Sequence, residues 1–102
     1  MADRANLQTE LEIILGSRNV YFTPPPSIRM QYDAIRYELG GKDLKRANDR
    51  IYLNTNQYSG VVITKNPDTP IPDKILSHFE MVSFGRPYTA DNLYHYPFTL
   101  YY

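Results

Sequence analysis

Cysteine and tryptophan are both absent from the 102 residues of this chain. Without cysteine, the chain can form no disulfide framework, no thiolate nucleophile and no cysteine-based zinc site. Histidine is scarce, with only two residues, and neither stands at a spacing typical of a serine triad or a metal site. A glycine pattern that would bind phosphate is also missing. The sequence therefore argues against an enzyme, and it predicts no cofactor and no metal.

Charge of one sign and long apolar runs are lacking as well. Eleven basic residues balance eleven acidic ones, so the formal net charge is zero at pH 7. Proteins whose affinity comes mainly from neutralising phosphates are strongly basic, so specific nucleic-acid binding is not expected. The apolar runs are short, and acidic side chains stand near the N-terminus, so neither a signal peptide nor a membrane span is predicted. A chain of this length indicates one domain over residues 1–102.

An amphipathic helix is predicted over residues 3–15, because apolar residues recur there at the i, i+4, i+7, i+8 spacing of one helical stripe. The stripe consists of Leu7, Leu11, Ile14 and Leu15. Asp3 is suited to cap the start of this helix, and Gly16 is suited to end it. A short strand is predicted over residues 19–23, and the prolines at 24–26 must end it because they provide no backbone N–H.

The middle of the chain predicts two strands and a short helix. Polar and apolar side chains alternate over residues 34–39, as on a strand with one solvent-exposed face. Residues 57–65 contain a β-branched row and are expected to pair antiparallel with that strand. The charged segment 42–50 between the two strands is expected to be a mobile loop or the tip of a hairpin. Pro72 suits the first turn of a helix over residues 71–78.

The last third predicts a hairpin of strands 79–86 and 94–101, joined by a loop over residues 87–93 that contains turn-forming residues. Pro97 is expected to make the final strand an edge strand, because proline cannot donate to a sheet ladder. The predicted element order is α-β-β-β-α-β-β. This order indicates an α+β fold, in which a mainly antiparallel sheet of four or five strands carries two helices on one face.

Aromatic residues are abundant, with ten tyrosines and four phenylalanines. Aromatic rings with a polar tip suit contact surfaces. Because successive side chains of a strand point to opposite faces, only about half of these rings should face the core. The remainder motivates a hypothesis in which two surfaces bind other protein chains. One is the corner that contains Tyr21, Phe22 and Pro24. The other is the C-terminal hairpin, whose candidate contact residues are Tyr94, Tyr96, Tyr101 and Tyr102.

The charged loop offers a third candidate contact, through Lys45 and Arg46. These cations could bind nucleic acid or an acidic partner, but Asp43 and Asp49 stand among them and weaken their field. A solvated loop is the simpler interpretation.

The two histidines have simple structural interpretations. His78 is expected at the C-terminal end of a helix, where a partial positive charge is favourable, or as a satisfied surface histidine. His95 lies between Tyr94 and Tyr96 and is expected to face away from both, although a pH-sensitive interface is the alternative.

Three segments together resemble a family of small tailed-bacteriophage proteins from the head-to-tail junction. They are NVYFTPPPSIRMQYDAIRYEL, QYSGVVITKNPDTPIPDKIL and YTADNLYHYPFTLYY. The family is that of tail terminator, or tail completion, proteins, and the similarity extends from about Leu7 to Tyr102. It depends on the order and spacing of aromatic, proline and polar turn blocks.

The resemblance implies a structural virion protein of the tail and neck, assembled in the host cytoplasm. Proteins of this family form a ring, commonly a hexamer, that caps the finished tail tube and docks to the head connector or head-closure protein. The implied partners are therefore other copies of this chain, the tail tube protein and the connector, with no membrane. DNA would pass through the ring without specific binding. The resemblance also implies an α+β fold and carries over no catalytic residue.

Three alternatives stay open at the level of sequence. A head-closure or connector subunit from the same junction would also be small and ring-forming. A small enzyme would need a nucleophile, a metal cluster or an acid/base pair, none of which is recognisable. A nucleic-acid-binding module would bind DNA tightly and with strong salt dependence, which the balanced charge does not favour.

Overall fold

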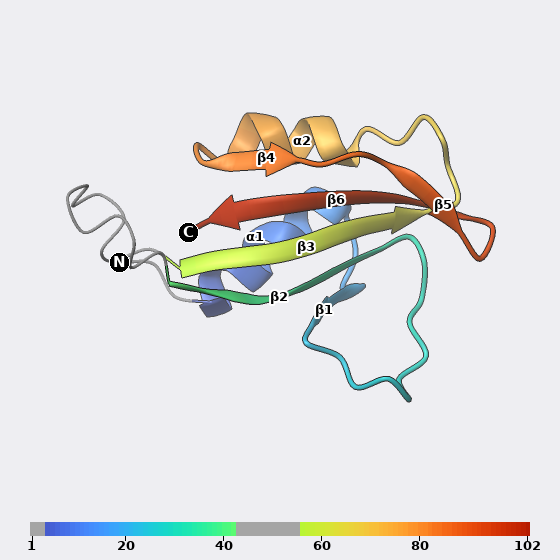
Figure 1. Ribbon diagram of the computed structural model, residues 1–102, viewed down its shortest axis with the longest axis horizontal. Helices are drawn as coiled ribbons and strands as arrows, with labels where there is room; N and C mark the ends of the chain where they lie inside the picture. The colour runs from blue at the N-terminus through green and yellow to red at the C-terminus, as the bar shows by residue number, and fades with distance from the viewer. Residues whose placement is uncertain (1–3, 43–55) are drawn as a thin grey trace.

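The computed structural model of the protein describes residues 4–42 and 56–102. It has an α+β fold with two helices and a six-stranded mixed sheet, which confirms the predicted fold class (Figure 1). The elements in chain order are α1 (Arg4–Leu15), β1 (Val20–Phe22), β2 (Ala34–Lys42), β3 (Asn56–Thr64), α2 (Ile71–His78), β4 (Val82–Phe84), β5 (Tyr88–Ala90) and β6 (Leu93–Tyr101).

The strands lie in the order β1-β2-β3-β6-β4, and β5 pairs with β6 beyond the end of β4. The predicted antiparallel pairing of β2 with β3 is confirmed, and β6 is also antiparallel to its neighbours. Only β1 runs parallel to its partner, β2. The sheet is therefore mainly antiparallel, as predicted, but it contains six strands where four or five were predicted.

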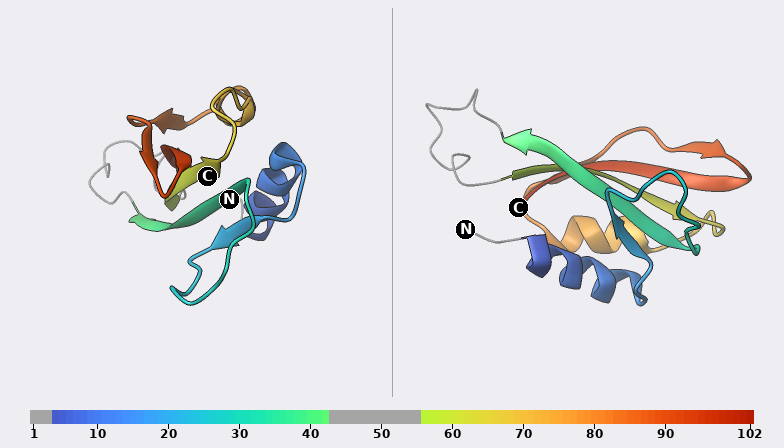
Figure 2. Two further views of the ribbon diagram at one scale, coloured as in Figure 1. Left: turned by 90° about the vertical axis from the view of Figure 1, so that its right-hand side faces the viewer. Right: turned by 90° about the horizontal axis from the view of Figure 1, so that it is seen from below.

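Both helices cover the same face of the sheet, as predicted (Figure 2). The α1 helix ends where expected, because Gly16 adopts a positive φ of 83° and its N–H donates to the carbonyl of Glu12 at 2.9 Å. The α2 helix has the predicted bounds, with Pro72 in its first turn. Asp3, the predicted cap of α1, lies outside the described residues.

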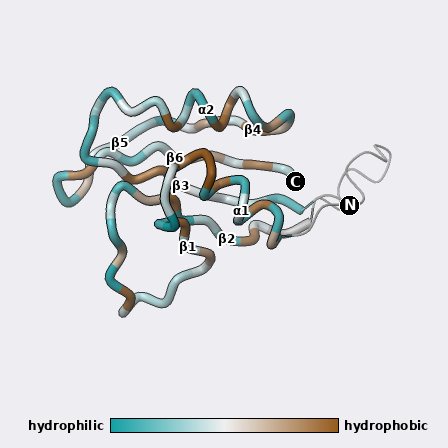
Figure 3. The backbone as a smooth tube through the Cα atoms, turned by 180° about the vertical axis from the view of Figure 1, so that it is seen from behind, coloured by the Kyte–Doolittle hydropathy of each residue, from teal (hydrophilic) through white to brown (hydrophobic). Residues whose placement is uncertain are grey.

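The core lies between the helices and the sheet. It contains the inward residues of α1 and α2 and the alternate residues of the central strands: Leu7, Leu11, Ile14, Val20, Ile35, Tyr37, Tyr58, Val62, Ile71, Ile75, Phe79, Phe98 and Leu100. Figure 3 shows apolar stretches along α1 and the central strands, whereas the turn between β5 and β6 is largely hydrophilic. The opposite face of the sheet, which we call the open face, is covered by neither α1 nor α2 (Figure 2).

Tyr37 is a polar group within this core, with only 1 % of its surface exposed. Its hydroxyl donates to Gln8 Oε1 at 2.6 Å, and the Gln8 amide nitrogen donates to the carbonyl of Val20 at 2.9 Å. Burial raises the pKa of Tyr37 above its usual range, because the ionised phenol would lose its hydration. This hydrogen-bond chain connects α1 with β1 and β2.

The prediction that Pro97 lies on an edge strand is wrong, since β6 has neighbours on both sides. The Pro97 carbonyl accepts the N–H of Gly85 at 2.9 Å, so it points away from β3. In an antiparallel strand the N and C=O of one residue point to the same side. The missing N–H of Pro97 therefore faces the interruption between β4 and β5, where it removes no hydrogen bond from the β3 ladder.

The predicted loop over residues 87–93 is also wrong, because it contains β5. Tyr88, Thr89 and Ala90 pair with His95, Tyr94 and Leu93, which leaves only Asp91 and Asn92 in the turn. Both turn residues have a positive φ, of 53° and 63°. This conformation is typical of a two-residue type I′ hairpin, in which short polar residues are tolerated.

The strand predicted over residues 34–39 is longer than expected, since β2 continues to Lys42. The pairing register with β3 shifts between Leu39 and Gly41, as at a β-bulge. Leu39, predicted on the buried side, is 53 % exposed, so the alternation stops before the bulge. The rest of the charged segment, including Lys45 and Arg46, lies outside the described residues.

Candidate docking surfaces

The first candidate surface is the loop over residues 23–33, which we call the proline arm. Its local sequence explains why it leaves the sheet. Thr23 makes the last hydrogen bond to β2, from its N–H to the carbonyl of Tyr37 at 2.8 Å, and the prolines that follow cannot continue the ladder. The arm then projects beyond the β1 edge of the sheet (Figures 1 and 2).

Two hydrogen bonds shape the arm. The Ile28 N–H donates to the carbonyl of Pro25 at 3.1 Å, which closes a turn at residues 25–28. The Gln31 N–H donates to the hydroxyl of Tyr21 at 2.9 Å, which fastens the returning chain to β1. The arm therefore has a defined turn and a fixed base.

Apolar side chains on the arm face solvent. Ile28 is 45 % exposed and Tyr32 is 37 % exposed, and Pro25 and Pro26 are exposed as well. Pro24, the proline chosen from the sequence, is half-buried at the base of the arm. The most exposed apolar side chains of this corner therefore lie further along the chain than Pro24.

The other aromatic residues of this corner are held by the body of the protein. The centroids of the Phe22 and Tyr37 rings lie 5.0 Å apart. The Arg4 guanidinium lies 4.4 Å from the centroid of the Phe22 ring as a cation–π pair. Phe22 is 36 % exposed. Tyr21 is half-buried, and its hydroxyl is the acceptor for the arm.

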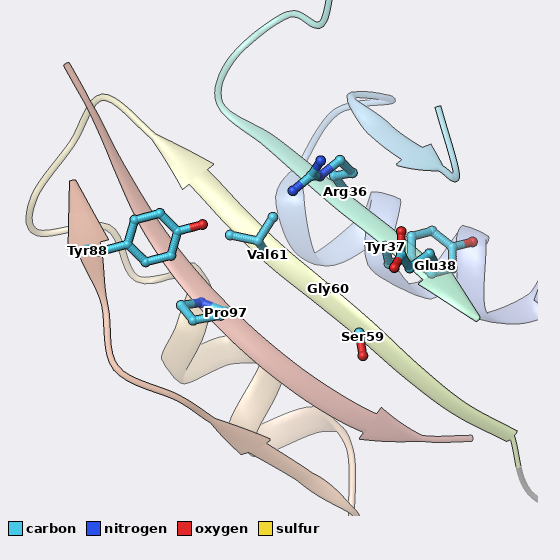
Figure 4. Close-up of a pocket in the computed structure, with 8 residues that line it drawn as sticks. All are labelled: Arg36, Tyr37, Glu38, Ser59, Gly60, Val61, Tyr88 and Pro97. Atoms are coloured by element: carbon cyan, nitrogen blue, oxygen red, sulfur yellow. The ribbon is translucent and has the colours of Figure 1, made fainter. Parts of the chain in front are cut away.

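The second candidate surface is a hollow of about 190 Å³ on the open face. Figure 4 shows the residues that line it. Its lining includes Tyr88, Val61 and Pro97, with the charged residues Arg36 and Glu38 on β2. Tyr88 is 50 % exposed and crosses over β6 towards Val61. The hollow thus combines an exposed aromatic ring with apolar and charged neighbours.

Tyr88 is held in place by His95, its register partner on β6. The two rings stack with centroids 4.8 Å apart and an angle of 14° between their planes. A ring nitrogen of His95, Nδ1, lies 3.1 Å from the carbonyl oxygen of Leu93. Tyr96 packs against the core instead, so His95 and Tyr96 face opposite sides of β6, as predicted.

The tyrosines predicted to form the C-terminal contact surface are all half-buried. Tyr96 and Tyr102 pack against the core, and their hydroxyls donate to the carbonyl of Pro67 and to Glu10 Oε2. Tyr94 and Tyr101 lie on the same strand, near its two ends. Two of the tyrosines predicted to contact another chain, Tyr96 and Tyr102, therefore make contacts within the fold.

Glu10, His78 and Tyr102 form a cluster that joins α1, α2 and the chain end. His78 Nε2 lies 2.6 Å from Glu10 Oε1, and the other carboxylate oxygen accepts from Tyr102. The hydrogen bond from Tyr102, together with the contact to His78, lowers the pKa of Glu10, although partial burial opposes this. His78 is thus a satisfied surface histidine in the last turn of α2, as predicted.

Among residues 4–42 and 56–102, no three acidic or histidine side chains gather closely enough to hold a metal ion. None of the helices in this part of the chain is long and apolar enough to cross a membrane.

Sequence reasoning missed the pair formed by Tyr88 and His95, because it placed Tyr88 in a loop. The signal that could have found it is the dipeptide Asp91–Asn92, which suits a two-residue turn. With the turn there, Tyr88 falls opposite His95.

In comparisons with known proteins, no family model, curated protein or solved structure matches the chain. The comparisons therefore assign no family, and the resemblance to tail terminator proteins is carried forward as a proposal.

Proposed function

We propose that this protein is a structural virion subunit that forms a ring at the end of a bacteriophage tail tube and docks the tube to the head connector. The sequence resemblance in three segments motivates this function. The observation that carries it furthest is the presence of two different exposed surfaces, the proline arm at the β1 edge and the hollow beside Tyr88 on the open face.

A closed ring of identical subunits needs such a pair of surfaces. Each subunit must present one face to the neighbour before it and a different face to the neighbour after it, and the rotation between them must close. A single self-complementary patch would give a dimer instead. The arm at the β1 edge and the hollow on the open face are two such different surfaces, which is compatible with the ring.

The ring would also protect the sheet. The outermost strands of the sheet are the three-residue strands β1, β4 and β5. Short edge strands limit uncontrolled pairing with strands of other chains. Neighbouring subunits in a ring would cover much of what remains exposed.

The proposal is tested by the mass of the assembled protein and by its position in the particle. We expect light scattering and native mass spectrometry of the purified chain to give a closed multiple of the 11.9 kDa subunit, with a hexamer as the leading expectation. Electron microscopy of virions should place this multiple at the end of the tail tube.

Two results would contradict this proposal. If the purified chain stays monomeric at high concentration, it does not form the proposed ring. A ring found on the portal side, away from the tail tube, would assign the protein to the head-closure class instead.

A further inference from the structure

We infer that neighbouring copies of this chain bind each other by placing the proline arm of one copy on the Tyr88 surface of the next. The Tyr88 surface consists of Tyr88, His95 and Pro97 with Asp91 at its margin. This inference rests on the proposed ring, because it names the contact between its subunits.

The positions of the two surfaces make this contact possible. The arm extends from the β1 edge of the sheet, and Tyr88 belongs to β5 at the opposite edge. Both lie in the right-hand half of Figure 1, towards the same end of the long strands. A second copy placed alongside the first, edge to edge, would therefore bring its arm close to the Tyr88 surface. Each copy then uses one surface per neighbour, which is the arrangement of a ring or a filament.

The apolar chemistry of the two surfaces also matches. The arm presents Pro25, Pro26 and Ile28, and the opposite surface presents a half-exposed tyrosine ring beside Pro97. Covering Ile28 and Tyr88 would remove apolar area from water, which favours association.

Both surfaces are largely ordered before they meet. The turn at residues 25–28 and the bond from Gln31 to Tyr21 shape the arm, and the stack on His95 holds the Tyr88 ring. Less conformational freedom is lost on binding when both partners are pre-organised. The contact therefore needs little rearrangement.

The charges at the margins are complementary. Arg29 follows Ile28 on the arm, and Asp91 lies at the turn that follows β5. Both are exposed, and neither forms an ion pair with another residue in the described part of the chain. Seating Ile28 near Tyr88 would bring the Arg29 guanidinium and the Asp91 carboxylate of the next copy within reach of each other.

The test uses two variants of the full chain, each of which damages one surface. Ile28→Asp places a charge on the arm, and Tyr88→Ala removes the ring from the opposite surface. We expect each variant alone to be monomeric by light scattering. An equimolar mixture should give dimers of one Ile28→Asp and one Tyr88→Ala chain and nothing larger, since each pair retains one intact arm and one intact Tyr88 surface.

Matched controls separate loss of contact from loss of folding. Ile13→Asp makes the same change at a residue of α1 that is 73 % exposed, and this variant should assemble as the unaltered chain does. Tyr88→Phe retains the ring and should also assemble. Thermal melting of both monomeric variants should remain cooperative, with far-UV circular dichroism unchanged.

A second measurement addresses the charges. Arg29→Gln and Asp91→Asn should each raise the subunit dissociation constant about twofold to fivefold, as expected for an exposed ion pair. Asparagine suits the positive φ of residue 91. The double variant should be no weaker than either single one, because both changes remove the same interaction.

The possible failures are distinguishable. Suppose first that the unaltered chain forms rings. If both surface variants then also form rings, or if their equimolar mixture stays monomeric, the arm contact is wrong and the proposed ring stands. If the unaltered chain is itself monomeric, the proposed function fails, and this inference fails with it.

Discussion

At the scale of single residues, Gly60 shows how closely the sheet and its aromatic core fit. It lies on β3 opposite Phe98 of β6, and Phe98 is buried with 3 % exposed surface. A Cβ atom at Gly60 would stand only 2.4 Å from the tip of the Phe98 ring. The ring can therefore lie across β3 only because residue 60 has no side chain.

We predict that Gly60→Ala destabilises the fold by about 1–3 kcal/mol, the usual cost of overpacking a well-packed core. The buried Phe98 ring has to move, and its neighbours must move with it. Urea unfolding followed by circular dichroism would measure the change. Gly85→Ala is the matched control, because its nearest contact would be Pro97 Cγ at an ordinary 3.6 Å. Equal stability of the two variants would contradict the prediction.

At the scale of elements, the Glu10 carboxylate connects parts of the chain that are distant in sequence. It accepts hydrogen bonds from the end of the chain at Tyr102 and lies against His78 of α2. Both helices also bury apolar side chains in the common core, among them Ile14 and Ile75. Glu10 therefore adds a pH-dependent contribution to a helix pair that is otherwise held by burial.

The sign of this contribution follows from the direction of the shift. The folded state lowers the pKa of Glu10 from its ordinary value of 4.5, so the folded protein binds this proton less readily than the unfolded chain does. The stabilisation is complete above the ordinary pKa and is lost as the pH falls through the lowered one. Because Glu10 is partly solvated, we expect less than about 1 kcal/mol.

We predict that Glu10→Gln abolishes this part of the pH dependence of unfolding, which the unaltered chain shows as the pH falls below the ordinary pKa of 4.5. The free energy of unfolding, measured in urea at several pH values, should fall less steeply in the variant. Glu38→Gln, at an exposed position on the open face, should retain the steeper slope. Parallel pH profiles for the unaltered chain and Glu10→Gln would refute the assigned role of Glu10.

At the scale of the whole molecule, the balance of charge limits the partners that the protein can bind by electrostatics alone. The formal net charge is zero, and the molecule is elongated, with extents of 43 × 26 × 23 Å. A ring of such subunits would let DNA pass without holding it strongly.

We predict that the purified protein binds duplex DNA only weakly at physiological salt, with a dissociation constant no tighter than about 10⁻⁶ M, the range of non-specific binding. Fluorescence anisotropy of a labelled duplex at two salt concentrations would measure this, with a basic DNA-binding protein as the positive control. Tight binding that weakens steeply with salt would favour a nucleic-acid-binding module over the ring.

Local patterns in the sequence were sufficient for several elements. The helical stripe and Gly16 predicted α1, Pro72 and the apolar spacing after it predicted α2, and β-branched residues predicted the pairing of β3 with β2. The same patterns located the proline arm as a corner after β1. Each of these features depends on residues close together in the chain, whose spacing and backbone preferences are visible without the fold.

Other features depended on partners that are distant in the chain. Pro97 lies in an interior strand because its missing N–H meets the interruption between two short strands, and no local pattern reveals where a neighbouring strand is interrupted. The tyrosines divide in the same way, since Tyr96 and Tyr102 are engaged within the fold while Tyr88 faces solvent. The sequence by itself determined both helices and the strands other than β5. Only the tertiary structure decided which aromatic side chains are left for a partner, because burial and hydrogen bonding depend on what packs against each ring.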